Sequence, residues 1–297
     1  MALNFEEAAR RAEILTQAMP YIRKYRGKII AIKYGGNAMV SEELKNQVME
    51  DIALLHMIGV HVVLLHGGGP EISAGLRKIG KESRFVDGLR VTDEETIDVV
   101  QMVLAGKVNK SLVNLLQHKG VNAVGLSGID AHMIRAVMKD PELGYVGRIT
   151  DVDVSLVRDV MDAGYVPVIS TLGADDEGNI YNINADTAAA WIAGAMGAER
   201  LFMMTDIAGI LRDKDDPSSL ISCIDIDEAV ELFNQGVISG GMIPKVDCCI
   251  DAIHRGVHRV IVMDGRVSHS ILLEILTNEG AGTMVMEKKE PEEDTKQ

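Results

Sequence analysis

Short apolar runs that alternate with amphipathic helical patterns restrict the fold of this chain more than any other feature. A chain that alternates in this way folds as a mostly parallel sheet with helices on both faces. We therefore predict an α/β fold, an open three-layer αβα sandwich with a central mostly parallel sheet and two lobes. The patterns predict strands at 28–34, 60–66, 121–126, 166–170, 200–205 and 259–263, and helices near 41–58, 70–79, 93–118, 153–163, 184–196, 225–235, 242–255 and 269–276.

The two ends of the chain and one internal segment fall outside this alternation. An amphipathic helix is predicted before the first strand, with apolar residues at helical spacing from Phe5 up to Pro20. Its apolar face packs either on its own domain or on another subunit, and periodicity does not separate the two. Residues 133–150 resemble a hairpin with turn signals at Asp140-Pro141 and Gly144. We predict four regions: an N-terminal helix (1–20), two lobes (21–195 and 196–286) and a mobile acidic tail (287–297).

Composition excludes several classes of protein. The formal net charge of −14 over 297 residues argues against a nucleic-acid or anionic-membrane surface. The three cysteines, Cys223, Cys248 and Cys249, lack metal-binding spacing, and we assign no metal site to protein side chains. Their odd number and the charged N-terminus fit a cytoplasmic protein without a secretory or membrane-spanning segment.

Two predicted strands end in glycine turns that are suited to phosphate. The first ends in Lys33-Tyr-Gly35-Gly36 and the second in His66-Gly67-Gly68-Gly69, and a helical pattern follows each. Glycines let backbone N–H groups approach an anion closely, and the helix dipoles point their positive ends at the same place. Lys33 adds a full charge, so the pair predicts a phosphate site at one edge of the sheet.

Four later segments add polar groups at strand ends or helix starts. Arg90 lies in Gly88–Thr92 and suits a substrate carboxylate, although a lone arginine also fits a surface ion pair. Asn182, Asn184 and Asp186 precede a helix rich in small residues, where Asn184 or Asp186 could equally cap the helix. The others are Thr205–Leu211 and the glycine-led helix start Ser239–Lys245.

Two well-known motifs, the Walker A loop and the esterase oxyanion loop, are only partly matched by this sequence. Gly75–Lys81 nearly matches a Walker A loop, but Glu82 replaces the required hydroxyl residue and no strand precedes the segment. The run of three glycines after His66 resembles the oxyanion loop of an esterase, but Gly125–Gly128 lacks the spacing of a nucleophile elbow.

Taken together, these segments resemble the amino-acid kinase family, from about residue 20 to 286 and thus over nearly the whole chain. Within that family they are similar to the branch that acts on N-acetyl-L-glutamate. The resemblance implies transfer of the ATP γ-phosphoryl group to the side-chain carboxylate of N-acetyl-L-glutamate. The products are ADP and N-acetylglutamyl 5-phosphate, in a step of arginine biosynthesis.

The resemblance also implies roles for individual residues. Lys33 and Lys245 lie on the transferring phosphoryl and leaving ADP, and Asp186 holds both lysines. Gly36 and Gly68 donate hydrogen bonds to phosphoryl oxygens, and the N-acetylglutamate ligands are Gly68, Gly69, Arg90 and Asn182. The nucleotide pocket in the C-terminal lobe is lined by Asp206, Ile207, Ala208, Gly209, Ile210, Leu211, Val237, Ile238 and Ser239.

The expected chemistry needs no general base, because a carboxylate acceptor is already ionised at pH 7. Positioning and charge neutralisation then suffice, and His66 is expected to be structural. Mg²⁺ enters with ATP and is held by its phosphates, so no protein ligand is named.

The N-terminal helix resembles that of the arginine-inhibited kinases of this family, in which such helices interlace dimers into a hexamer. That branch implies feedback inhibition by arginine, and Glu279 fits either a ligand of its guanidinium or a solvated loop residue. The implied arginine site consists of Tyr21, Arg200, His269, Glu279 and Gly282.

Three alternative functions differ from this one in the substrate or in the class of protein. A sister kinase for carbamate, glutamate or aspartate has the same lobes, but Arg90 and the Asn182 segment argue against it. A catalytically inactive regulatory subunit conflicts with the presence of Lys33, Asp186 and Lys245. An acetyltransferase that uses this fold to bind N-acetylglutamate needs an added acyltransferase domain, which we do not expect here.

Overall fold

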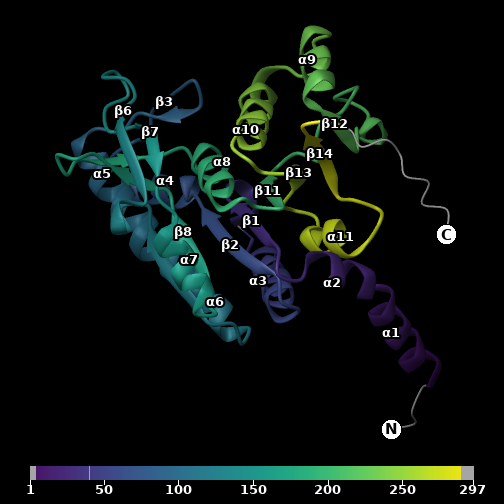
Figure 1. The fold of residues 1–297 in the computed structure, drawn as a ribbon. Helices are drawn as coiled ribbons and strands as arrows, with labels where there is room; N and C mark the ends of the chain where they lie inside the picture. The colour runs from purple at the N-terminus through teal and green to yellow at the C-terminus, as the bar shows by residue number, and fades with distance from the viewer. Residues whose placement is uncertain (1–4, 40, 289–297) are drawn as a thin grey trace.

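The computed structural model describes residues 5–39 and 41–288, and its largest element is an eight-stranded sheet (Figure 1). Every neighbouring pair of strands in this sheet runs parallel except β13 with β14. The predicted mostly parallel sheet is therefore confirmed, with β12 and β14 added to the six predicted strands. The strand order is β12 (Cys223–Asp225), β14 (Gly282–Met286), β13 (Arg259–Asp264), β11 (Arg200–Thr205), β1 (Ile29–Tyr34), β2 (His61–His66), β8 (Val166–Ser170) and β5 (Ala123–Ser127).

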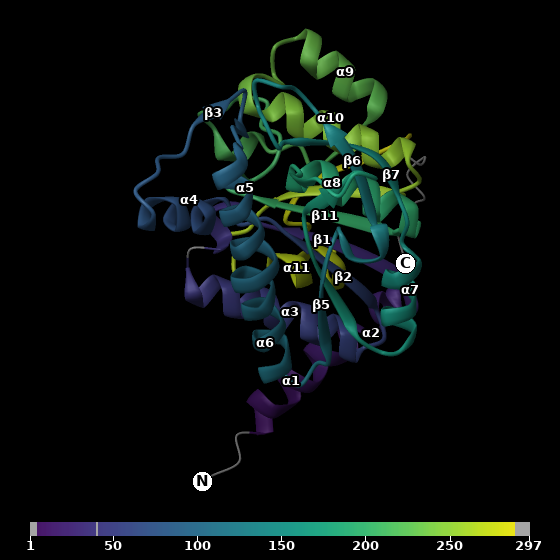
Figure 2. The same cartoon turned by 90° about the vertical axis from the view of Figure 1, so that its left-hand side faces the viewer.

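Alternating side chains on the central strands enter two separate apolar cores, one on each face of the sheet. Ile32 on β1 and Leu64 on β2 pack on one face, whereas Ala31 and Leu65 pack on the other. Helices cover both faces, as the two views show (Figure 1 and Figure 2). The first face packs against α3 (Glu42–Met57), α4 (Gly69–Lys78), α5 (Glu94–Gln101), α6 (Asn109–His118) and α11 (Ser270–Leu276). The second packs against α7 (Ser155–Asp162), α8 (Ala185–Met196), α9 (Ile226–Asn234) and α10 (Ile243–His254).

The predicted hairpin at 133–150 is confirmed as the antiparallel pair β6 (Ile134–Met138) and β7 (Gly147–Val152). It belongs to a four-stranded sheet that also contains β9 (Leu172–Ala174) and β10 (Ile180–Asn182). A two-stranded ribbon, β3 (Phe85–Val86) with β4 (Leu89–Arg90), lies near α4 and α5 (Figure 2). These strands of two or three residues are too short to give a periodic signal in sequence.

Two predicted helices are interrupted. The pattern at 93–118 is not one α-helix, because the π-helix η2 (Met102–Val108) separates α5 from α6. The N-terminal pattern divides into α1 (Phe5–Gln17) and α2 (Met19–Tyr25), so the expected end at Pro20 is wrong. Pro20 lies in the first turn of α2, where the missing N–H is not needed for a helical hydrogen bond. The 3-10 helices are η1 (Gly36–Met39), η3 (Asp130–His132), η4 (Pro217–Ser219) and η5 (Gly240–Met242).

The remaining predictions concern the ends and the lobes. Most of the predicted tail, residues 289–297, lies outside the described residues. The division at residues 195 and 196 stays a prediction, because β1 pairs directly with β11 and the sheet is continuous there. No helix in the described part of the chain is long and apolar enough to span a bilayer.

Candidate active site

Lys33, Asp186 and Lys245 meet beside the carboxyl ends of the central strands. The Asp186 carboxylate lies 2.9 Å from Lys33 Nζ and 3.6 Å from Lys245 Nζ. The three side chains come from the end of β1, the first turn of α8 and the first turn of α10. The structure thus brings together the three predicted catalytic residues, which are separated by up to about two thirds of the chain.

Charge and local structure hold Asp186 in its ionised form. Burial by itself raises the pKa of Asp186, but the two lysines outweigh it, so the pKa lies below its ordinary value. Asn184 caps α8, since its side-chain oxygen accepts hydrogen bonds from the N–H groups of Asp186 and Thr187, each 3.0 Å long. Asn184 is therefore the cap, and the Asp186 side chain is free to bind the lysines.

The glycines after β1 and β2 leave their backbone close to this charge cluster. A Cβ on Gly35 would lie 3.2 Å from Lys33 Nζ, so a larger residue would crowd the ammonium group. Gly36 has a φ of +67°, in the left-handed region that favours glycine. Gly68 precedes α4, and a Cβ there would lie 2.7 Å from Leu104 Cδ2. The two glycine turns lie next to each other, since a Cβ on Gly35 would also lie 3.9 Å from Gly67 N.

A pocket of about 150 Å³ opens beside these turns and is lined by Arg90. Arg90 is only 7% exposed and donates 2.9 Å hydrogen bonds to Gly69 O and Ser73 Oγ, and a further one to Ser83 Oγ. The surface ion pair considered for Arg90 is therefore wrong. The lining residues are Gly67, Gly68, Gly69, Ile72, Phe85, Gly88, Leu89, Arg90, Leu104, Val146, Thr171, Asn182, Ile183, Asn184 and Ala185.

The pocket includes four predicted substrate ligands, Gly68, Gly69, Arg90 and Asn182, whereas Gly36 does not line it. Asn182 donates a 3.3 Å hydrogen bond to Thr92 Oγ1, which in turn donates to Arg90 O at 2.8 Å. The guanidinium also stacks over the Phe85 ring at 4.7 Å. Sequence reasoning missed the serines that hold Arg90, because neither lies in a recognisable motif.

The predicted nucleotide residues follow β11 and precede η5. The side chains of Ile210 and Ile238 are buried in the core. Thr283 Oγ1 accepts a 2.8 Å hydrogen bond from the Ile210 N–H. A Cβ on Gly209 would lie 2.5 Å from the same oxygen, which explains glycine at a φ of +146°.

The predicted arginine-site residues are only partly brought together. Arg200 is buried, and its guanidinium lies 3.1 Å from Glu274 Oε1, while Glu274 Oε2 accepts a 2.9 Å hydrogen bond from the Ala281 N–H. Glu274 thus joins Arg200 to the loop that contains Glu279 and leads to Gly282. Tyr21 lies on α2, which contacts α11.

His269, the remaining predicted member, is held away from Glu274. Its Nδ1 lies 2.6 Å from a carboxylate oxygen of the buried Asp51 on α3. Sequence reasoning missed Glu274 and Asp51, which lie within ordinary helical patterns.

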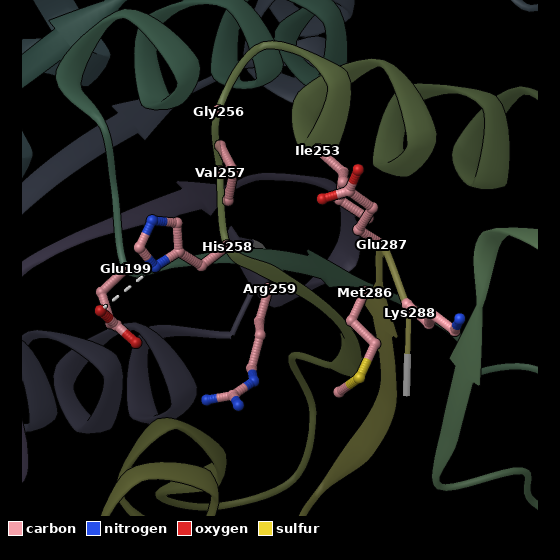
Figure 3. A pocket seen from close by; sticks show the side chains of 9 residues that line it. All are labelled: Glu199, Ile253, Gly256, Val257, His258, Arg259, Met286, Glu287 and Lys288. Carbon is pink, nitrogen blue, oxygen red and sulfur yellow. Dashed lines mark ion pairs between the residues drawn. The ribbon is translucent and has the colours of Figure 1, made fainter. Parts of the chain in front are cut away.

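A larger hollow of about 450 Å³ lies at the opposite, amino-terminal edge of the sheet (Figure 3). It contains Glu199, immediately before β11, and Arg259, the first residue of β13. Glu199 lies 3.5 Å from His258 Nδ1. Because none of the candidate catalytic residues lines this hollow, we place the active site at the glycine turns instead.

Comparison with known proteins identifies the family of this chain. Residues 28–264 match the amino acid kinase family. The chain is 54% identical over 276 residues to the acetylglutamate kinase of Brachyspira hyodysenteriae, covering 92% of this chain and 96% of that protein. It is 50% identical over 275 residues to the acetylglutamate kinase of Alkaliphilus metalliredigens, covering 93% and 87% respectively.

Solved structures show the same fold in a wider set of enzymes. The N-acetylglutamate synthase from Neisseria gonorrhoeae, complexed with coenzyme A and N-acetyl-glutamate, matches with a TM-score of 0.81 and 27% identity. The match covers 94% of this chain but 64% of the synthase chain. Carbamate kinase from Giardia lamblia matches with a TM-score of 0.63 and 18% identity, which shows likeness of fold alone.

Proposed function

The chain belongs to the acetylglutamate kinases of the amino acid kinase family, and on this premise we propose that it phosphorylates N-acetyl-L-glutamate with ATP. The γ-phosphoryl group moves to the side-chain carboxylate, giving ADP and N-acetyl-L-glutamyl 5-phosphate. The observation that carries the proposal is the Lys33–Asp186–Lys245 cluster beside a pocket that contains a buried arginine.

Each part of the site has a role in this transfer. Two lysines and one carboxylate leave one net positive charge for the phosphoryl group, whose transition state spreads negative charge over its oxygens. The N–H groups of Gly36 and Gly68 donate to those oxygens. Arg90 pairs with the α-carboxylate of N-acetylglutamate, and Asn182 and Gly69 complete its binding site.

Mg²⁺ in this proposal arrives with ATP. Asp186, the carboxylate nearest the reacting groups, is already paired with both lysines. Among the described residues no group of three His, Cys, Asp or Glu side chains is arranged to hold a metal ion. The nucleotide phosphates, which are good Mg²⁺ ligands, would therefore supply most of the coordination.

The test is ADP release with MgATP and N-acetyl-L-glutamate, with the acyl phosphate trapped as a hydroxamate. Glutamate, aspartate and carbamate run alongside as alternative acceptors. Hydroxamate from N-acetylglutamate alone supports the proposal. Activity only on another acceptor would contradict the substrate and keep the phosphoryl transfer.

Lysine variants test the assigned roles. We expect Lys33→Ala and Lys245→Ala each to lower kcat by about 100-fold or more. Each substitution removes a positive charge that stabilises the transferring phosphoryl group. Lys78→Ala, on an exposed position of α4, is the matched control and should leave kcat unchanged. Near-normal kcat in both active-site variants would overturn the roles.

We further propose that arginine inhibits the enzyme and that α1 joins subunits in a hexamer. None of the residues of α1 is buried, and Phe5 and Leu15 are 76% and 72% exposed, which supports a partner for this helix. Glu279 is exposed and can accept a guanidinium bidentately. Tyr21, Arg200, His269 and Gly282 complete the proposed arginine site.

Deletion of residues 1–19 tests this regulation. Arginine is titrated into the hydroxamate assay of the full chain and of the truncated chain. Inhibition of the full chain alone supports the proposal, and equal inhibition of both would contradict the role of α1.

A further inference from the structure

A buried asparagine outside every recognised motif connects the sheet to the glycine turn after β2. Asn109, the first residue of α6, is fully buried, and its Nδ2 lies 2.8 Å from Val168 O and 3.1 Å from Leu126 O. Carbonyl oxygens only accept hydrogen bonds, so the amide nitrogen must face them. The orientation of the Asn109 amide is therefore determined by its two backbone partners.

The tautomer of His66 follows from its other ring nitrogen. Gly67 O only accepts hydrogen bonds, so the ring proton resides on Nδ1, and Nε2, 3.1 Å from the same Asn109 Nδ2, carries no proton. Nδ1 lies 2.9 Å from Gly67 O and donates to it. Burial and, to a smaller extent, Lys110 lower the pKa of His66 to about 4, although the hydrogen bond to Gly67 raises it, so the imidazole is neutral near pH 7.

The hydrogen bond to Gly67 O determines where the next N–H points. The Gly67 carbonyl and the Gly68 N–H belong to one planar trans peptide unit, so they point in opposite directions. On the other side of Gly67, its N–H donates a 3.1 Å hydrogen bond to Tyr34 O. No acceptor within the described ranges takes the Gly68 N–H, which is the group that donates to the phosphoryl oxygens in the proposed reaction.

The π-helix η2 contacts both ends of this hydrogen-bonded chain, Asn109 and Gly68. It ends at Val108, directly before Asn109. Two of its side chains, Leu104 and Val108, come within 2.7 and 3.3 Å of where a Cβ on Gly68 would lie. Segments of π-helix are uncommon and are frequent at functional sites. The Oδ1 of Asn109 is buried without a partner among the described residues.

We propose that Asn109 and His66 form a positioning pair that aims the Gly68 N–H at the transferring phosphoryl group. Asn109 packs against the Nε2 edge of the imidazole, and His66 orients the Gly67–Gly68 peptide. Neither side chain exchanges a proton with the substrate. This proposal rests on the proposed phosphoryl transfer.

Two substitutions at His66 separate its two ring nitrogens. Asparagine places its amide where Nδ1 lies and can still donate to Gly67 O, whereas glutamine replaces Nε2 and loses that donor. We expect His66→Gln to lower kcat by about 100-fold and His66→Asn by less than about tenfold, with KM for ATP nearly unchanged in both. His118→Gln, on an exposed position of the same helix as Asn109, is the control and should keep the wild-type kcat. Equal losses in the two variants, or a wild-type kcat in His66→Gln, would overturn the proposal.

The tautomer can be measured without any variant of doubtful stability. Nitrogen-15 chemical shifts of the wild-type protein at pH 7 should show His66 protonated at Nδ1 and not at Nε2. An Nε2-protonated ring in the wild type would refute the positioning pair even in an active enzyme. A wild-type chain that forms no hydroxamate would instead refute the proposed function, while the tautomer result would stand.

Discussion

The carboxylate of Asp186 lies between two lysine ammonium groups, at 2.9 Å from one and 3.6 Å from the other. The side chain of Lys245 is 27% exposed and that of Lys33 only 10%, so the Lys33–Asp186 pair is better shielded from water and interacts more strongly. Removing one partner from such a cluster leaves an uncompensated buried charge. Single residues thus set the charge of the site, and both lysines share one carboxylate, which leaves one net positive charge.

A substitution of the single residue Arg90 tests the proposed binding of N-acetylglutamate. Its guanidinium uses several N–H groups at once on Gly69 O, Ser73 and Ser83, which a lysine ammonium cannot reproduce. We expect Arg90→Lys to raise KM for N-acetylglutamate by about tenfold or more, with KM for ATP little changed. Arg84→Lys, exposed in the neighbouring loop, is the control. A selective rise in KM for ATP in steady-state kinetics would contradict the assignment.

The helices α8 and α10 carry Asp186 and Lys245, so their packing sets the distance between these charges. They touch at Gly194, where a Cβ would lie 2.4 Å from Arg255 Cβ and 3.0 Å from Arg255 O. The Arg255 guanidinium also lies 3.4 Å from the centre of the Trp191 ring. A small residue on one helix therefore allows the close approach that the charge cluster requires.

Gly194→Ala tests that packing. The added methyl group has backbone on one side, so the helices must separate, at a cost of about 1–3 kcal/mol. We expect a lower midpoint of urea unfolding together with a lower kcat, because Lys245 moves away from Asp186. Ala195→Ser, one residue on and exposed, should change neither. Loss of stability with a fully retained kcat would show that the helix spacing does not matter to catalysis.

A second contact between elements joins α3 to α11 through Asp51 and His269. Burial raises the pKa of Asp51 to about 6, even though its hydrogen bond to His269 lowers it. The folded state therefore holds the Asp51 proton more tightly than the unfolded state, where the pKa is about 3.9. Its contribution to stability is greatest below the unfolded pKa and is lost as pH rises from about 4 to 6.

Asp51→Asn should remove this pH dependence. Relative to wild type, the variant should gain about 2–3 kcal/mol of unfolding free energy between pH 4 and pH 7. Urea unfolding of both proteins at the two pH values measures the difference. A relative loss over that range would mean that Asp51 is stabilised in its charged form and would refute the prediction.

At the scale of the whole molecule, the chain carries a net charge of −14 yet binds, in our proposal, two anionic substrates. Local cations at the glycine turns resolve this conflict, because they act at short range while the remaining acidic surface is screened by salt. The N-terminal helix is the other large-scale feature, since it extends from the body in both views (Figure 1 and Figure 2). Its exposed apolar residues support the proposed contact with another subunit.

Removal of residues 1–19 should lower the mass of the particle in solution. α1 contributes no buried side chain to its own subunit, so the truncated enzyme should fold and keep its activity without arginine within about threefold. Light scattering after size-exclusion chromatography measures the mass. An unchanged mass would place the contacts between subunits elsewhere.

The sequence by itself determined the alternation of strands and helices, the glycine turns after Lys33 and His66, and the identity of the three central charged residues. The alternation and the turns are local features, since periodicity and turn chemistry depend on neighbours within a few positions, whereas the three charged residues were identified by their resemblance to the amino-acid kinase family. Only the tertiary structure decided the partners that hold the site. Asn109 meets His66 across 43 positions, and Arg200 meets Glu274 across 74. The π-helix before Asn109 was likewise hidden inside an ordinary helical pattern. Such contacts depend on how whole helices pack on the sheet, and no local pattern in the chain records that packing.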